Sequence, residues 1–134
     1  MAQTDIQILL TGGRVINNWP CYEPHGELSG SVIITPGNDL NCQHVLARLK
    51  WHTEGRGDRA EKVVAEQDLF QGHLSAGQPQ HFDFHFALPG EPWSYAGHYL
   101  SIVWEVEVEI DLPLAFNPKR LERFVLAPLT RGGS

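Results

Sequence analysis

The sequence predicts an all-β protein, built as a sandwich or barrel of antiparallel sheets with about seven to nine strands. The clearest sign is the stretch from Ile102 to Asp111, in which one face carries Ile102, Trp104, Val106, Val108 and Ile110 and the other carries Glu105, Glu107, Glu109 and Asp111. A second stretch, from Gln80 to Leu88, alternates apolar residues, three of them phenylalanine, with polar ones. Successive side chains of a strand point to opposite faces of a sheet, so each pattern indicates a strand with one buried face. Turn residues separate the segments, and none of them is a convincing helix.

The first half of the chain contains four predicted strand segments. Ile6–Thr11 and Arg14–Ile16 are apolar runs on either side of a glycine pair, which permits a tight turn. Residues 19–27 hold two prolines and a glycine, so we expect no regular structure there. Strands follow at Leu28–Thr35, which ends at a turn cluster, and at Cys42–Glu54, where apolar and polar residues alternate.

The second half contains one ambiguous segment and three clear strands. Residues 58–70 are rich in helix-forming residues, and Asp58 with Glu61 resembles a helix capping box. The apolar residues of this segment form no helical stripe, and the surrounding chain is all strands. We therefore predict a strand here, with a helix as the alternative. The clear strands are 80–88, 101–111 and 122–127.

Length and composition indicate one globular domain. The chain has 134 residues, and we expect a single domain at 1–128 followed by a frayed tail at 129–134. At this length roughly two-thirds of the unfolded surface can be buried, which is enough for a core without disulfides or metal. Hydrophobic residues make up 42% and charged residues 19%, which is a globular composition. The formal net charge of -6 disfavours nucleic acid and anionic membranes as partners. No apolar run approaches the roughly 18 residues of a membrane helix, so we expect no membrane insertion.

The two cysteines, Cys21 and Cys42, leave two alternatives open. The N-terminus has no basic region before its short apolar run, so nothing indicates secretion. We therefore expect a cytoplasmic protein, in which thiols stay reduced. Free thiols are the favoured interpretation, and a Cys21–Cys42 disulfide is the alternative.

Several short motifs, in a consistent order, resemble the N-terminal sandwich of the arrestin superfamily. They are a proline–glycine turn leading into a glycine-containing strand at 22–32, a strand at 45–55, a phenylalanine-rich strand ending in Leu-Pro at 82–89, and a Pro-Trp-Ser-Tyr-Ala-Gly lead-in at 92–97 before the strand 101–111. The resemblance spans residues 22–126. It implies an immunoglobulin-like antiparallel β-sandwich of the arrestin N-domain type. Such sandwiches are protein-interaction scaffolds in arrestins, in the related retromer subunit and in bacterial sporulation-control proteins.

The chain also departs from the arrestin pattern. Arrestins pair two sandwiches, and this chain is long enough for only one. The basic residues that arrestins use to sense phosphate lie on their first strand, whereas the corresponding stretch here, Asp5–Leu10, has no Lys or Arg. Receptor binding, phosphate recognition and the inter-domain clasp are therefore not expected.

Three polar residues of the strand 80–88 form a candidate metal site. His81, Asp83 and His85 occupy alternate positions and point the same way, and His52 is a further candidate zinc ligand. Residues two apart on a strand are roughly 7 Å apart at the backbone, which makes it awkward for all three to bind one ion. Two of them together with a ligand from a neighbouring strand could form a zinc site. A solvated polar face is the favoured interpretation.

The acidic residues Glu105, Glu107, Glu109 and Asp111 share one face of the last long strand. Paired carboxylates carry out glycoside hydrolysis, but like charges on one exposed face are ordinary for a half-solvated sheet. If the strand with Arg48, Lys50 and His52 lies alongside, opposite charges would pair between the two strands. We therefore expect a solvated face, and a partner that docks on it would be basic.

The four tryptophans divide into two pairs. Alternation places Trp51 and Trp104 inward, in the core. Trp19 and Trp93 lie in proline-containing turns, where their rings could be exposed and stack on a carbohydrate. Packing of the tryptophans in the core or in turns is the favoured interpretation.

No residue pattern specifies a reaction. Ser94 and Ser101 lack a Gly-x-Ser-x-Gly context, and neither cysteine has a neighbouring histidine motif. We therefore expect a non-enzymatic, arrestin-like adaptor that needs no cofactor and binds a protein partner. Self-association through an exposed edge strand is also expected. The alternative is a sandwich that binds a small ligand, either a carbohydrate or a metal.

Overall fold

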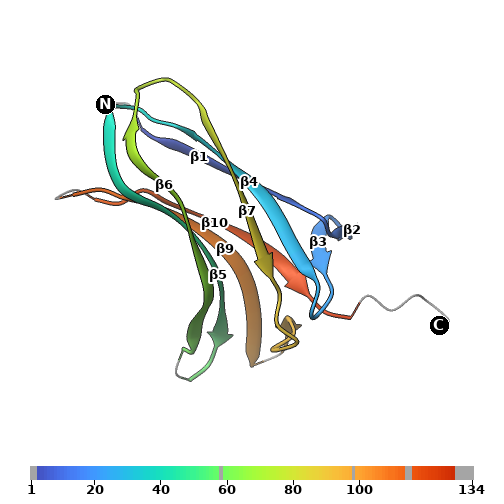
Figure 1. Ribbon diagram of the computed structural model, residues 1–134. Coiled ribbons are helices and arrows are strands. Elements are labelled where there is room, and N and C mark those ends of the chain that lie inside the picture. Colours follow the sequence, from blue (N-terminus) through green and yellow to red (C-terminus); the bar gives the residue numbers. More distant parts are fainter. Residues whose placement is uncertain (1–2, 58, 98, 114–115, 129–134) are drawn as a thin grey trace.

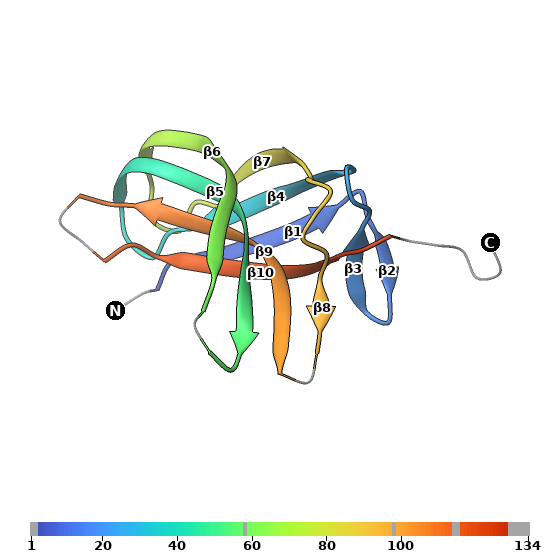
Figure 2. The same cartoon turned by 90° about the horizontal axis from the view of Figure 1, so that it is seen from below.

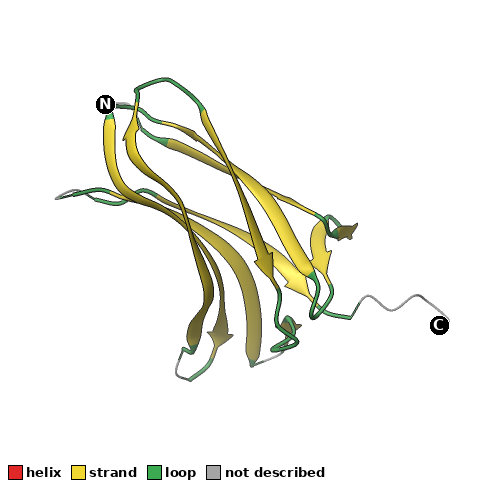
Figure 3. Ribbon diagram, viewed as in Figure 1, coloured by secondary structure: helices red, strands yellow, loops and turns green. Residues whose placement is uncertain are grey.

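The computed structural model describes residues 3–57, 59–97, 99–113 and 116–128 of the chain (Figure 1). These residues form ten strands in two sheets and no helix (Figure 3), which confirms the predicted all-β sandwich. The strands are β1 (Asp5–Thr11), β2 (Arg14–Ile16), β3 (Trp19–Tyr22), β4 (Glu27–Thr35), β5 (Leu40–Gly55), β6 (Glu61–Leu74), β7 (Gln80–Ala87), β8 (Tyr95–Ala96), β9 (Leu100–Asp111) and β10 (Lys119–Leu126).

The smaller sheet has three antiparallel strands in the order β1-β4-β7. In its register Leu10 lies opposite Gly30, and Gly30 lies opposite Phe84. A Cβ atom on Gly30 would lie 2.4 Å from the Phe84 ring and 2.6 Å from the carbonyl oxygen of Leu9. Glycine is therefore required at this position, because the phenylalanine ring lies directly over the backbone.

The larger sheet has seven strands, with β2-β3-β10-β9-β5-β6 as its main order and β8 paired to β9. Pairing is antiparallel except between β3 and β10, which run parallel through Val125 with Cys21 and Leu126 with Tyr22. The sheet curves strongly along β5, β6 and β9 (Figure 1). In Figure 2, β8 lies beside the start of β9 while β10 runs on toward β3.

The core lies between the two sheets. Alternation along β9 brings its apolar row inward, and Trp104 is completely buried there, as predicted. The apolar rows of β5, β4 and β7 complete the cluster; its fully buried members are Leu28, Val32, Ile34, Val45, Ala47, Leu49, Trp104, Val106, Val108, Ile110 and Leu126. Trp51, also predicted to be inward, is partly buried against the same cluster.

The ambiguous segment 58–70 is a strand from Glu61 onward, as predicted; residues 59 and 60 precede the strand, and residue 58 lies outside the described part. It contributes to β6, which pairs with β5 along its length: Leu40 lies opposite Leu74 at one end and His52 lies opposite Glu61 at the other. Three register shifts interrupt this pairing. Cross-strand hydrogen bonds along the long strand β5 therefore outweigh the helix propensity of the segment.

The expectation of irregular structure at 19–27 is wrong for its first four residues and for its last, Glu27, which begins β4. Trp19–Tyr22 forms β3, which follows β2 through a two-residue turn. Asn17 and Asn18, the turn residues, have φ values of 53° and 67°. Positive φ at both positions suits a tight hairpin, and asparagine tolerates it better than most residues.

Both cysteines are free and buried, which confirms the favoured interpretation. The tail predicted at 129–134 lies outside the described residues. Among the described residues, no helix has the length and apolar character needed to cross a membrane.

Candidate functional site

A groove forms where β10 separates from β9. The two strands pair from Lys119–Glu109 to Phe124–Trp104, after which β10 pairs with β3 instead. The strand β8 then takes the vacated edge of β9, with Tyr95 opposite Ile102. We call the hollow between β8, β9 and β10 the fork groove. It arises because three strands share one junction and diverge from it.

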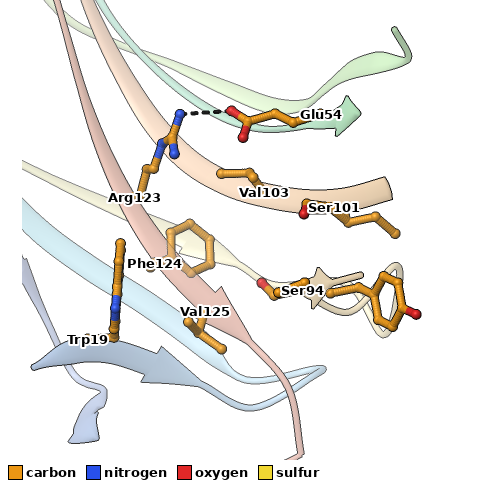
Figure 4. Close-up of a pocket in the computed structure, with 11 residues that line it drawn as sticks. Trp19, Glu54, Ser94, Ser101, Val103, Arg123, Phe124 and Val125 are labelled. Atoms are coloured by element: carbon orange, nitrogen blue, oxygen red, sulfur yellow. Dashed lines mark hydrogen bonds and ion pairs between the residues drawn. The ribbon is translucent and has the colours of Figure 1, made fainter. Parts of the chain in front are cut away.

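The fork groove has a volume of about 440 Å³ and a mainly apolar lining. Its apolar side chains are Trp19, Tyr95, Ala96, Ile102, Val103, Phe124 and Val125. Figure 4 shows the Trp19 indole beside the Phe124 ring, and Trp19 keeps 48% of its surface exposed. Exposed aromatic and aliphatic side chains in a preformed hollow are typical of a binding surface.

An ion pair closes one end of the fork groove. Arg123 Nη2 lies 3.0 Å from Glu54 Oε2, as Figure 4 shows. The same oxygen lies 2.8 Å from His52 Nε2. The hydrogen bond from His52 lowers the pKa of the Glu54 carboxyl, and the charge of Arg123 adds to this against a smaller opposing effect of desolvation.

Behind this ion pair, His52 joins a buried carboxylate. His52 Nδ1 lies 3.1 Å from Glu105 Oε2, and both side chains are almost completely buried. The other oxygen of Glu105, Oε1, is buried without a hydrogen-bond partner. The outer face of the sheet thus carries a connected polar chain, Arg123–Glu54–His52–Glu105, which begins at the groove and ends inside the protein.

Ser94 fixes the strands at the junction. Its backbone N–H donates to the Leu126 carbonyl at 2.8 Å, and its hydroxyl accepts the Leu126 N–H at 2.9 Å. These two bonds join the start of β8 to the end of β10. The Ser94 hydroxyl is therefore used to hold the fold, although it lines the groove.

A second hollow, which we call the Trp93 pocket, lies against the same strand β8. It has a volume of about 460 Å³ and is lined by Gly90, Glu91, Trp93, Ser94, Tyr95 and Ile102. The last three residues also line the fork groove. The two hollows are therefore neighbours.

The acidic row of β9 is not the solvated face that we expected. Glu105 and Glu107 have only 1% and 7% of their surfaces exposed. Neighbouring strands cover them, because Arg48 and Lys50 of β5 lie opposite Glu107 and Glu105 in the register. The expected pairing of charges between the two strands is confirmed: Arg48 Nη1 lies 2.9 Å from Glu107 Oε1 and 2.5 Å from Glu109 Oε1.

The candidate zinc ligands are not brought together. His81 and His85 lie on the exposed face of β7, where His81 Nε2 is 3.1 Å from Asp83 Oδ1 and His85 pairs with Glu27. His52 lies in the other sheet with its two carboxylate partners. Within the described ranges, no group of three or more His, Cys, Asp and Glu side chains is arranged to hold a metal ion.

Trp19 and Trp93 are both about half exposed, at 48% and 51%, and each lines a hollow of its own. Sequence reasoning missed Glu54, Arg123 and Tyr95 as members of the site. Tyr95 belongs to the lead-in motif of 92–97, and this motif was the one sequence feature that pointed to any of the three residues. Glu54 and Arg123 carry no local pattern that separates them from other surface charges.

Comparisons with known proteins support the fold. No protein-family model matches the chain, and no curated protein matches it in sequence. Among solved structures it is similar to Spo0M, a sporulation control protein from Bacillus subtilis, with a TM-score of 0.72 and 15% sequence identity. The match covers 95% of this chain and 50% of that chain, so this chain spans about half the length of Spo0M. The predicted arrestin-like fold is confirmed.

Proposed function

We propose that this chain is a non-enzymatic interaction domain of the adaptor type, which binds an extended segment of a partner protein in the fork groove. Its arrestin-like fold supports a regulatory or adaptor role, because the similar structure is that of a sporulation control protein. At 15% identity this similarity concerns the fold. The proposal therefore depends on the groove itself.

The observation that carries the proposal is the composition and fixed shape of the fork groove. Its walls come from β3, β8, β9 and β10, and the bonds between Ser94 and Leu126 hold the junction. A groove that is already formed loses little entropy when a ligand binds, which favours affinity. Tryptophan is enriched among the residues that dominate binding energy, and Trp19 forms an exposed wall here.

The groove is also unlike a hydrolytic site. Its Ser94 hydroxyl accepts a backbone N–H, and its one ion pair, Glu54–Arg123, connects to a buried histidine that faces carboxylates at both ring nitrogens. These contacts favour positioning over proton transfer to a substrate. They support an interaction domain, with the cytoplasm as its expected location.

A capture experiment with matched variants tests the proposal. The full chain is expressed in its own cell as wild type, as Trp19→Ala, and as Leu9→Ala, and captured proteins are quantified by mass spectrometry. Leu9 is a suitable control because it is 53% exposed and lies on β1, in the other sheet. We expect Trp19→Ala to reduce recovery of the specific partner by at least about tenfold, the effect of losing an energetically dominant tryptophan.

The control distinguishes binding in the fork groove from nonspecific association through any exposed apolar side chain. Leu9→Ala should retain the partner at the wild-type level. Equal recovery by all three forms, with unchanged thermal unfolding, would rule out the fork groove as the binding surface. Recovery of a glycan instead of a protein would favour the small-ligand alternative.

A further inference from the structure

We propose that the Trp93 pocket binds the cationic side chain of a lysine or arginine of the partner. This inference rests on the proposed function and specifies the chemistry of the partner. The recognised segment of the partner would then place apolar residues in the fork groove and a neighbouring basic residue in the Trp93 pocket.

The two aromatic walls of the pocket are Trp93 and Tyr95, which are 51% and 59% exposed. The face of an aromatic ring carries negative electrostatic potential, and tryptophan attracts cations most strongly of the aromatic residues. Ile102, which also lines the pocket, supplies an apolar surface for the aliphatic part of a lysine or arginine. The lining thus suits both parts of a basic side chain.

The pocket is held in shape by the protein itself. Trp93 Nε1 donates to the Gly90 carbonyl at 2.8 Å, which fixes the indole against its own loop. The next residue back, Pro92, accepts a 2.7 Å hydrogen bond from Nε1 of Trp104, whose side chain is completely buried. Ser94 is bonded to Leu126 on the other side. The exposed indole is therefore presented by a loop that is anchored to the core and to β10.

The charge of the lining favours a cation. Glu91 is the one charged residue among those that line the Trp93 pocket, and no Lys or Arg is present there. An anionic side chain would therefore meet a carboxylate and no compensating charge. The whole chain also has a formal net charge of -6, which attracts basic segments over longer distances.

A sugar fits the lining less well. Carbohydrates need several polar side chains that converge on their hydroxyls, together with an aromatic face. The polar side chains here are Glu91 and Ser94, and the Ser94 hydroxyl already accepts the Leu126 N–H. A lining with one carboxylate and two aromatic rings matches a single positive charge better than it matches the several hydroxyls of a sugar.

The position of the pocket connects it with the fork groove. Ser94, Tyr95 and Ile102 line both hollows, which lie against the same strand β8. A peptide in the fork groove therefore passes within reach of Trp93. Binding energy from both hollows would add within one partner segment.

The test uses short peptide probes and the full chain. Capped pentapeptides Gly-Gly-X-Gly-Gly, with X as lysine, arginine, norleucine or glutamate, are titrated while NMR follows the indole N–H of Trp93 and the ring of Tyr95. Maltose is a fifth probe. We expect the lysine and arginine peptides to bind at least about threefold more tightly than the norleucine peptide, as a partly exposed cation–π contact predicts. The glutamate peptide and maltose should shift neither residue.

Variants identify the groups responsible. Glu91→Gln should remove most of the preference for lysine over norleucine, whereas Glu23→Gln, the same change at an exposed carboxylate outside this lining, should not. Trp93→Ala, followed through Tyr95, should abolish binding of the basic peptides. Trp19→Ala should leave it unchanged, since Trp19 does not line this pocket.

Three outcomes would overturn the inference: equal binding of lysine and norleucine, tighter binding of glutamate or maltose, or no shift at Trp93 and Tyr95 with any probe. The proposed function fails separately. If the peptides leave Trp93 unaffected while Trp19→Ala still loses the captured partner, only the cation pocket is wrong. If the peptides bind as expected while Trp19→Ala captures as much partner as wild type, the fork groove is wrong.

Discussion

His52 Nδ1 lies 3.1 Å from Glu105 Oε2 in a pair that is buried on the outer face of the larger sheet, with 3% and 1% of the two residues exposed. The other ring nitrogen of His52 faces Glu54 at 2.8 Å. The pair therefore links the interior of the sheet to the edge of the fork groove.

We expect His52→Leu to lower the free energy of unfolding by about 3 kcal/mol, because it leaves the buried Glu105 carboxylate without its donor. The double variant His52→Leu/Glu105→Leu should be closer to wild type than either single variant, since two apolar side chains can replace a buried polar pair. Urea unfolding of the four forms measures this. Additive losses would show that the two residues act independently. His44→Leu, which removes an exposed pair with Asp68, should cost less than about 1 kcal/mol.

Arg48 holds three carboxylates together, those of Glu66, Glu107 and Glu109. We expect Arg48→Met to lower the free energy of unfolding by about 3 kcal/mol at neutral pH, because Glu109 would stay largely buried without its ion-pair partner and Glu107 would keep only Lys50, at 3.5 Å. Glu66→Gln is the matched control. Glu66 has a side chain that is 47% exposed, so its loss should cost less than about 1 kcal/mol. Denaturant unfolding of both variants would contradict this account if their losses were equal.

The lowered pKa of the Glu109 carboxyl leads to a prediction of how the stability of the protein depends on pH. Burial opposes its ionisation, but hydrogen bonds from Arg48 and Asn117 outweigh burial and lower its pKa below the ordinary value. A carboxyl with a lowered pKa in the folded state contributes stability at pH values above its unfolded pKa of about 4.3. That contribution is lost as pH falls through the folded pKa. We therefore expect unfolding midpoints in urea to be similar at pH 7 and about pH 5.5, and to fall below about pH 4.

Arg48→Met is the control for this pH dependence. Without Arg48, Glu109 loses the largest of the causes that lower its pKa, so the variant should lose less stability between about pH 5 and about pH 3 than wild type does. An equally steep loss in both proteins would assign the acid sensitivity to other carboxyls. The lowered pKa of Asp68, caused by hydrogen bonds from Gln71 and His44, makes that residue the first alternative.

Self-association through an edge strand remains a prediction, and β2 is the edge that best fits it. All three residues of β2 are exposed, and Val15 is 75% exposed. An unprotected apolar edge can pair with a second copy, and a lysine on such an edge opposes pairing. We expect wild type to form dimers with rising concentration and Val15→Lys to remain monomeric, as measured by light scattering. Val63→Lys, on the edge strand β6, should behave as wild type; a monomeric wild type at every concentration would refute the prediction.

Much of the fold could be predicted because it depends on local alternation. The inward row of β9, with Trp104 at its centre, follows from a side-chain period of two. The pairing of Arg48 with the acidic row could also be expected once two strands of opposite charge were recognised. Residues 58–70 could not be decided by propensity, because pairing with β5 determines their conformation.

The candidate site could be predicted much less well. The fork groove exists because β10 leaves β9 at Phe124 and pairs in parallel with β3, which is about a hundred residues earlier in the chain. No pattern in either segment indicates that partner. The groove therefore joins Trp19, Glu54 and Arg123 from three strands. The sequence marked only Trp19, as a candidate for stacking on a carbohydrate, and no pattern marked Glu54 or Arg123.

The acidic row of β9 has one property that the sequence determined and one that the tertiary structure determined. Alternation by itself placed Glu105 and Glu107 on the face opposite the core, and this is where they lie. Only the tertiary structure decided that they are buried, because Arg48, Lys50 and His52 from β5 cover them. A strand's own residues specify which way each side chain points, whereas the depth of burial depends on neighbouring strands that come from distant parts of the chain.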